Sequence, residues 1–220
     1  MRTTIAKITA AGLTAALLSS TAALAAFNAT ATTDLNIRSG PGPQFEVVGA
    51  IANSDTATVN GCIEGSKWCQ VTYNGTTGWS YSEYLSADFT GQQTVISMAP
   101  QTAQIPVIEN DQASTNATVG IAGGVIAGAL IGGPVGAAIG GVAGAAVGAT
   151  VTPPPTVKTY VMENRAEPVY LDGEVVIGAG VPDTVELRPV PDYDGYQYVN
   201  INGQPVLVDA GTRQIVYVYR

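Results

Sequence analysis

Two cysteines, Cys62 and Cys69, are the only thiols in the sequence, and they flank a short turn at residues 63–67. Cysteines that face each other across a hairpin can form a disulfide, which would contribute about 2.5 kcal/mol by closing so short a loop. The alternative is a redox-active or nucleophilic thiol, which needs a neighbouring base. The chain contains no histidine to act as that base. We therefore expect a Cys62–Cys69 disulfide.

The lack of histidine also restricts other chemistry. A Ser-His-Asp triad, a histidine-bearing metal site and a histidine pH switch all require an imidazole. Asp183, Asp192, Asp194 and Asp209 offer oxygen ligands for calcium, but their spacing matches no EF-hand loop and is typical of solvated turns. We predict no catalytic residue, no metal site and no cofactor, and thus a protein that is not an enzyme.

The first 26 residues have the layout of a secretory signal peptide. Arg2 and Lys7 accompany an apolar run over residues 8–24, and Ala23-Leu24-Ala25 fits a cleavage site. An uncleaved N-terminal membrane anchor is the alternative. Removing the two basic residues leaves seven of nine against seventeen acidic ones, so the mature net charge is 7 − 17 = −10. We expect an exported protein of the periplasm or cell envelope that does not bind nucleic acid.

The elements that would position the cysteines lie within residues 27–90, a region of short β-type runs separated by turns. The runs cover residues 34–38, 47–51, 56–59, 68–73 and 78–81. Asn74-Gly75 lies between the last two runs and is the strongest short-range signal for a hairpin. Five short strands in so few residues predict a small barrel or sandwich.

Three motifs in this region carry a resemblance to a known family. The stretch LNIRSGPGPQFEVVG is followed by WCQV and then by GWSYSEYL. Together they resemble the bacterial SH3-like (SH3b) domain over roughly residues 31–86. The resemblance implies a partly open barrel of five strands, which binds cell-wall peptides or other peptide ligands and has no catalytic role.

The same resemblance places the loop at residues 38–41 beside the presumed ligand groove. The candidates for ligand contact are Arg38, Ser39, Trp68, Tyr73 and Tyr81. Other roles are open for some of them. Arg38 could close a salt bridge or cap its loop, and Trp68 could cover the disulfide. Trp79 and Tyr84 are better explained as barrel packing.

Two regions of different composition follow the barrel. Residues 91–118 are rich in Gln, Thr, Ala and Pro without periodicity, which predicts a flexible linker. The prolines at 153–155 predict a stiff spacer over residues 152–156.

Residues 157–220 predict a β-rich domain, either a meander or an α+β fold. Strands are expected at 196–201, 205–208 and 214–219, with turns at Asn202-Gly203 and residues 209–213. The runs at 175–178 and 185–188 could add one or two strands. The region resembles a domain of unknown function that is common in exported alphaproteobacterial proteins, and the resemblance implies an envelope location.

Residues 119–151 carry no charge and contain glycines at a constant spacing of four. These are Gly120, Gly124, Gly128, Gly132, Gly136, Gly140, Gly144 and Gly148. On a helix this spacing forms a bare ridge that lets another backbone approach closely, as in a glycine zipper. Because each glycine costs about 1 kcal/mol relative to alanine, such a helix would form only against a partner or in a bilayer.

Pro134 interrupts this register and predicts a kink or tight turn. The two halves would be about 20 and 26 Å long at 1.5 Å per residue, whereas a bilayer core is about 30 Å thick. We therefore expect a helical hairpin that associates with a membrane or with copies of itself. A single kinked span and a disordered Gly/Ala linker are the alternatives.

The sequence as a whole thus predicts a mainly β protein with a small SH3-like barrel, a glycine-zipper helical hairpin and a β-rich C-terminal domain. The expected function is non-enzymatic. The SH3b domain would bind a cell-wall peptide or a protein ligand, and the zipper would mediate membrane association or self-association. The alternative is an assembly protein in which zipper-driven oligomerisation is the function and the SH3b domain only packs.

Overall fold

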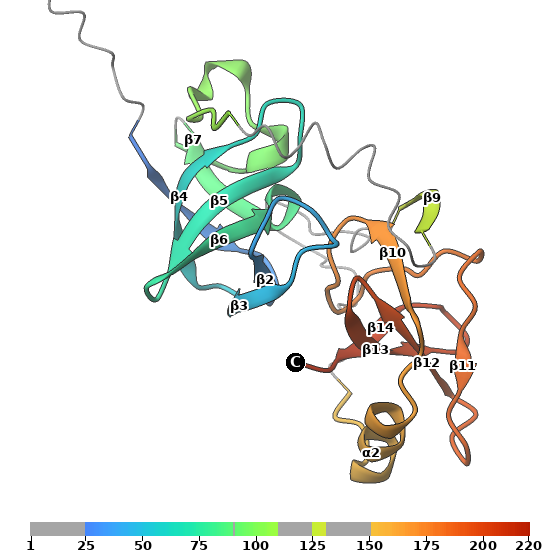
Figure 1. Ribbon diagram of the computed structural model, residues 1–220. Coiled ribbons are helices and arrows are strands. Elements are labelled where there is room, and N and C mark those ends of the chain that lie inside the picture. The colour runs from blue at the N-terminus through green and yellow to red at the C-terminus, as the bar shows by residue number, and fades with distance from the viewer. Residues whose placement is uncertain (1–24, 90, 110–124, 131–150) are drawn as a thin grey trace, which may run out of the picture.

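The computed structural model describes residues 25–89, 91–109, 125–130 and 151–220 (Figure 1). These residues form two β-rich domains, as the short β-type runs and turns in the sequence predict. One is an eight-stranded sheet and the other a six-stranded sheet. Residues 1–24 of the predicted signal peptide and most of the predicted glycine zipper lie outside the described residues.

The first body, the barrel domain, comprises the described residues from 25 to 109. Its strands are β1 (Phe27–Ala31), β2 (Leu35–Arg38), β3 (Val47–Ile51), β4 (Thr56–Cys62), β5 (Trp68–Tyr73), β6 (Thr76–Tyr81), β7 (Leu85–Phe89) and β8 (Gln92–Val95). Three short 3₁₀ helices complete it: η1 (Ser82–Tyr84), η2 (Ile96–Met98) and η3 (Gln101–Ala103). The strand order is β3-β2-β6-β5-β4-β1-β7-β8. The small SH3-like β domain expected from the sequence is confirmed, with eight strands where five were expected.

The β5–β6 hairpin forms where the sequence predicts it. Tyr73 pairs with Thr76, and Asn74 and Gly75 have φ angles of 47° and 80°. These left-handed conformations are what a two-residue turn between twisted strands requires, and Asn-Gly adopts them at low cost. On the other side of β5, Cys62 pairs with Cys69, so the hairpin register aligns the two cysteines.

Strand β2 departs from simple alternation of buried and exposed residues. The apolar Leu35 and Ile37 are buried in the barrel core, but Asn36 and Arg38 on the opposite face are also fully buried. A strand that is buried on both faces must have a second layer against its outer side. That layer is the C-terminal domain.

Residues 91–109 differ from the expected flexible linker. β8 pairs with β7 in an antiparallel ladder, in which Phe89 lies opposite Gln92 and Ser86 lies opposite Val95. Further along, Val107 forms a parallel bridge with Cys62. We call residues 105–108 the strap because they lie against the end of β4. Residues 110–118 of the predicted linker lie outside the described residues.

The second body, the C-terminal domain, comprises residues 151–220 together with the short strand β9. Its elements are β9 (Val125–Leu130), α2 (Pro155–Glu163), β10 (Pro168–Asp172), β11 (Arg188–Pro189), β12 (Tyr196–Ile201), β13 (Gln204–Asp209) and β14 (Ile215–Val218). The strand order is β14-β13-β12-β10-β9, with β11 paired to the side of β12. The predicted meander is β12, β13 and β14, whereas the run at 175–178 is not a strand.

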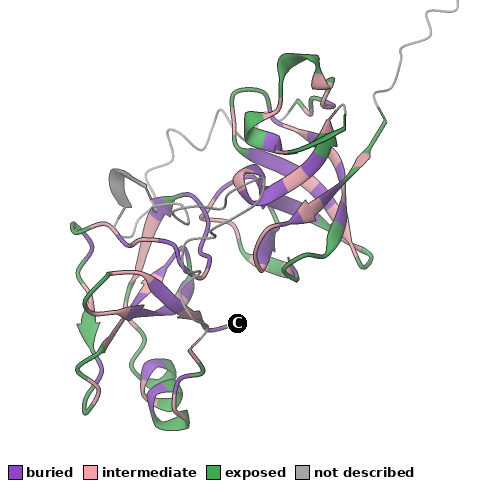
Figure 2. Cartoon of the chain, turned by 180° about the vertical axis from the view of Figure 1, so that it is seen from behind, coloured by how far each residue is buried: buried purple, intermediate pink, exposed green. Residues whose placement is uncertain are grey.

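Helix α2 begins within the predicted proline spacer. Pro155 occupies the first turn, where the lack of an N–H is harmless and the fixed φ angle suits a helix. Val157 and Val161, four residues apart, are buried against the sheet. The outward side of the helix is exposed, as Figure 2 shows.

Strand β9 corrects the helical prediction for residues 125–130. These residues, which include Gly128, run parallel to β10, with Val125 opposite Tyr170 and Leu130 opposite Asp172. Val125 and Ile126 favour extended structure, and the surrounding glycines oppose a helix. The other predicted zipper glycines lie outside the described residues, among which no helix is long and apolar enough to cross a membrane.

Candidate functional site: the inter-domain face and the disulfide pocket

Arg38 joins the two domains. Its Nε donates to Oε2 of Glu174 at 2.7 Å, and its Nη2 donates to Oε1 at 2.6 Å. Both side chains are completely buried. Two parallel N–H···O bonds make this a bidentate pair, the strongest form of arginine–carboxylate contact.

The rest of the Arg38 guanidinium closes its own loop. Nη1 donates to the carbonyl oxygens of Pro43 and Phe45, at 3.0 and 2.8 Å. Ser39, the next residue, is exposed. Both alternative roles considered for Arg38, a salt bridge and a cap for the loop, are therefore present, and its charged head faces the C-terminal domain.

Asn36 extends the contact between the domains. Its Nδ2 donates to Glu174 Oε1 at 3.0 Å and to Gln204 Oε1 at 2.8 Å. Its Oδ1 accepts from Arg220 Nε at 3.4 Å. Asn36 and Arg38 stand two residues apart on the same face of β2, so one carboxylate reaches both side chains.

Glu174 is held from its own side as well. The N–H of Val175 donates to Oε1 at 2.8 Å. Asn202 fixes the preceding residues, because its Oδ1 accepts from the N–H of Leu171 and its Nδ2 donates to the carbonyl of Gly173. Contacts within the C-terminal domain thus help to orient the carboxylate toward Arg38.

The structure brings Trp68 and Tyr81 together and leaves Tyr73 apart. The rings of Trp68 and Tyr81 meet edge to face at 5.3 Å between centroids, and Tyr84 packs behind Tyr81. All three are buried. Burial raises the pKa of the Tyr81 hydroxyl, and the nearby charge of Asp172 raises it further. These three rings therefore pack in the core of the barrel domain. The Lys67 ammonium lies over the Tyr81 ring.

Tyr73 lies at the far end of β5 and is partly exposed, and its hydroxyl donates to Asp55. That hydrogen bond raises the pKa of Tyr73. The five predicted ligand residues are therefore divided: Arg38 is at the inter-domain face, Trp68 and Tyr81 are in the core, and Ser39 and Tyr73 reach solvent.

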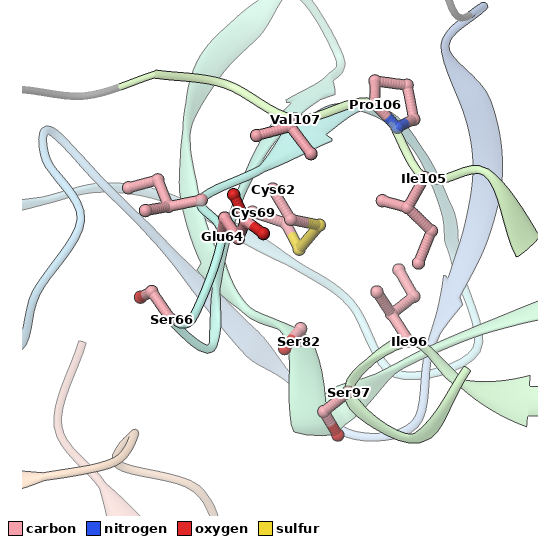
Figure 3. Close-up of a pocket in the computed structure, with 11 residues that line it drawn as sticks. Cys62, Glu64, Ser66, Cys69, Ser82, Ile96, Ser97, Ile105, Pro106 and Val107 are labelled. Atoms are coloured by element: carbon pink, nitrogen blue, oxygen red, sulfur yellow. A yellow bond between two sulfur atoms is a disulfide. The ribbon is translucent and has the colours of Figure 1, made fainter. Parts of the chain in front are cut away.

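A pocket lies on the barrel domain beside the Cys62–Cys69 disulfide (Figure 3). Its volume is about 220 Å³. The disulfide, Ile63, Ile96 and the strap residues Ile105, Pro106 and Val107 form an apolar lining, and Glu64, Ser66, Ser82 and Ser97 add polar groups. The predicted disulfide is confirmed. Besides linking β4 to β5, it forms part of the pocket wall.

The strap is held to β4 by main-chain hydrogen bonds. The N–H of Cys62 donates to Pro106 at 2.8 Å, and the N–H of Ile108 donates to Cys62 at 2.9 Å. Sequence reasoning missed these residues because residues 105–108 have no alternation of polar and apolar side chains. A usable signal was the short apolar run itself, which a solvated linker does not need.

Comparison with known proteins identifies both domains. Residues 33–86 match the bacterial SH3 domain, and residues 160–220 match a domain of unknown function (DUF1236). The chain therefore combines a bacterial SH3 domain with a DUF1236 domain, as the motifs predicted.

A curated relative shares part of the chain. The "Putative N-acetylmuramoyl-L-alanine amidase YrvJ" of Bacillus subtilis (strain 168) is 35% identical over 89 residues, which are 40% of this chain. The chain spans only 15% of the length of that relative, and the match falls on the SH3 region.

Proposed function

We propose that this chain is a non-enzymatic cell-envelope protein whose bacterial SH3 domain binds a cell-wall ligand. The observation that carries the proposal is a solvent-accessible pocket on an SH3 barrel whose sequence resembles part of a putative cell-wall amidase. The disulfide supports export, because such bonds persist in oxidising compartments.

The disulfide pocket is the part of the barrel best suited to hold such a ligand. Arg38 already has a carboxylate partner, and Trp68 and Tyr81 are packed in the core. The pocket offers an apolar surface for small apolar groups, and Glu64 with three serines could form hydrogen bonds to peptide or sugar groups. Ser39 and Tyr73 are the exposed candidates for a second contact.

Retention on purified peptidoglycan tests this proposal. We expect the secreted chain to sediment with the insoluble wall, and Ser97→Trp, which adds a bulky ring at the exposed lining of the pocket, to reduce retention at least tenfold. Thr159→Trp on the exposed side of α2 is the matched control and should retain normally. A wild-type chain that stays in the supernatant would contradict wall binding. Loss with Ser39→Ala and Tyr73→Ala, but not with Ser97→Trp, would rule out the pocket.

The glycine register supports a second part of the proposal, namely association with a membrane or with copies of the chain. It rests on the spacing of Gly120 to Gly148 in the sequence. Gly140→Leu should lower the amount recovered in the membrane fraction or in cross-linked oligomers. If both amounts are unchanged, the register has no such function. If oligomers form but wall binding fails, the assembly role is the better description.

A further inference from the structure

We propose that the C-terminal domain is a docking partner for the SH3 domain, and that Glu174 is its recognition residue for the Asn36–x–Arg38 face of β2. This assigns an interaction to residues 151–220, which the wall-binding proposal leaves without a role. The partner chemistry is specific: a guanidinium and a side-chain amide, two residues apart on one face of a strand.

The first support is the completeness of the contact. Asn36, Arg38 and Glu174 are fully buried, and Asn202 and Gln204 are nearly so. Within the described ranges, the buried side-chain atoms without a hydrogen-bond partner are Asn200 Oδ1 and Tyr219 Oη, and neither belongs to this group. A buried polar network is stabilising only when its members are paired, and here they are.

The second support is the cost of separating the domains. A guanidinium and a carboxylate that are completely buried have lost their hydration, and the bidentate geometry offsets that loss. Among the described residues, the other hydrogen-bond partners of Arg38 and Glu174 are uncharged, so neither side chain would keep an ionic partner if the domains separated. The Arg38–Glu174 pair is therefore suited to holding the two domain surfaces together, while Nη1 of Arg38 closes its own loop.

The third support is the choice of arginine. Two oxygens of Glu174 receive two different nitrogens of Arg38, which a lysine ammonium cannot reproduce. Asn36 adds a bond to the same carboxylate and pairs with Gln204. At the rim, Arg220 donates to the carbonyl of Asp34 at 3.1 Å and lies 3.6 Å from its carboxylate. The C-terminal domain thus contacts Asn36 and Arg38 of β2 and Asp34 directly before the strand.

The partner is the SH3 domain of the same chain. The two domains are joined covalently, so docking is intramolecular and is favoured by a high effective concentration. The same surface would accept the SH3 domain of a second copy only by exchange, which a shift in oligomeric state would reveal.

A cleavable form of the full chain tests the proposal. A specific protease site is inserted between residues 113 and 114, and the folded protein is cut and passed over a size-exclusion column. We expect the two fragments to co-elute at the position of the uncut monomer. After cutting, Glu174→Gln and Arg38→Lys should weaken the association of the fragments at least tenfold. Glu83→Gln, which breaks the exposed ion pair with Lys67, is the matched control and should have no effect.

Folding of the fragments is read separately. Trp68 and Trp79 are the two tryptophans of the chain and both lie in the barrel domain, so their fluorescence reports on that domain alone. Arg38→Lys fragments that separate while the tryptophans stay buried support docking through Arg38 and Glu174, because this substitution leaves the C-terminal domain unchanged. Wild-type fragments that separate on cutting would overturn the proposal, as would Glu174→Gln and Arg38→Lys fragments that stay together like the control. If Glu174→Gln unfolds, Arg38→Lys, which keeps the charge, decides the outcome.

Discussion

A Cβ atom on Gly61 would lie 2.7 Å from the carbonyl oxygen of Pro106 and 2.9 Å from Cγ1 of Ile108. The strap can lie flat on β4 only because position 61 has no side chain. The same carbonyl oxygen accepts the N–H of Cys62, so a displacement at Gly61 would break the main-chain contact that forms this wall of the pocket.

Gly61→Ala should therefore detach the strap while leaving the barrel folded. The methyl group meets backbone, which cannot rotate away as a flexible side chain would. We expect the amide hydrogens of Cys62 and Ile108 to exchange at least tenfold faster, measured by mass spectrometry. Gly195→Ala is the control, because a Cβ there meets nothing within 4 Å. Unchanged exchange at Ile108 would show that the strap is held by other contacts.

Removal of the disulfide should destabilise the barrel domain. The double variant Cys62→Ala/Cys69→Ala lacks a cross-link between residues seven apart in sequence, which corresponds to about 2.5 kcal/mol of unfolding free energy on the chain-entropy model. Urea denaturation followed by tryptophan fluorescence measures the loss. The wild-type chain under reducing conditions should show the same midpoint as the variant, and equal midpoints with and without reductant would contradict the expectation.

Asn202→Ala should destabilise the C-terminal domain by about 2–3 kcal/mol. The substitution leaves the N–H of Leu171 and the carbonyl of Gly173 unpaired in a buried place, and it puts alanine at a φ angle of 53°. Asn74→Ala at the other Asn-Gly turn has a similar φ angle of 47° but is exposed, so its loss should be much smaller. Thermal unfolding of both variants provides the comparison, and equal losses would mean that the buried hydrogen bonds contribute little.

Tyr219→Phe should raise the stability by about 1 kcal/mol. The Tyr219 hydroxyl is buried without a hydrogen-bond partner, and removing an unpaired buried polar group relieves its desolvation cost. Tyr198→Phe is the matched control, because it deletes a hydroxyl that donates to the carbonyl of Asn164 at 2.9 Å and should lower the stability. Chemical denaturation of the two variants should give shifts of opposite sign, and shifts of the same sign would refute this account.

Alkaline pH should destabilise the protein through the same side chain. Burial, together with the neighbouring Tyr217, raises the pKa of Tyr219 to about 12. An unfolded tyrosine ionises at a pKa of about 10. Between these two values the unfolded chain has lost the phenol proton and the folded chain has kept it, so stability falls as pH rises. Denaturation midpoints at pH 9, 10 and 11 should fall less steeply for Tyr219→Phe than for the wild type.

Much of the barrel can be predicted because its signals are local. The β5–β6 hairpin depends on Asn74-Gly75 and on the runs directly beside it, and the disulfide follows from the register of the hairpin formed by β4 and β5. The C-terminal meander is predictable for the same reason, since Asn202-Gly203 joins β12 to β13. In each case the partners are neighbours in the chain.

The inter-domain face could not be predicted because its partners are far apart in sequence. Arg38 and Glu174 are separated by 136 residues, and either residue alone is compatible with an exposed position. The resemblance to SH3b domains directed attention to a ligand groove, while the polar face of β2 is covered by the chain itself. Strand β9 was predicted as helix because a constant glycine spacing of four would place the glycines on one face of a helix. The spacing does not determine whether the residues between the glycines prefer a helix or a strand.

The pairing of Asn36 with Gln204 and Arg220 has a consequence for the order in which the protein can mature. These partners are 168 and 184 residues away, so a chain made from its N-terminus completes the SH3 domain long before its outer face can be covered. Contacts of such high sequence separation close slowly. Until residues 204 and 220 have been made, Asn36 on the outer face of β2 lacks these two partners, so docking of the domains cannot be completed before the C-terminal end is synthesised.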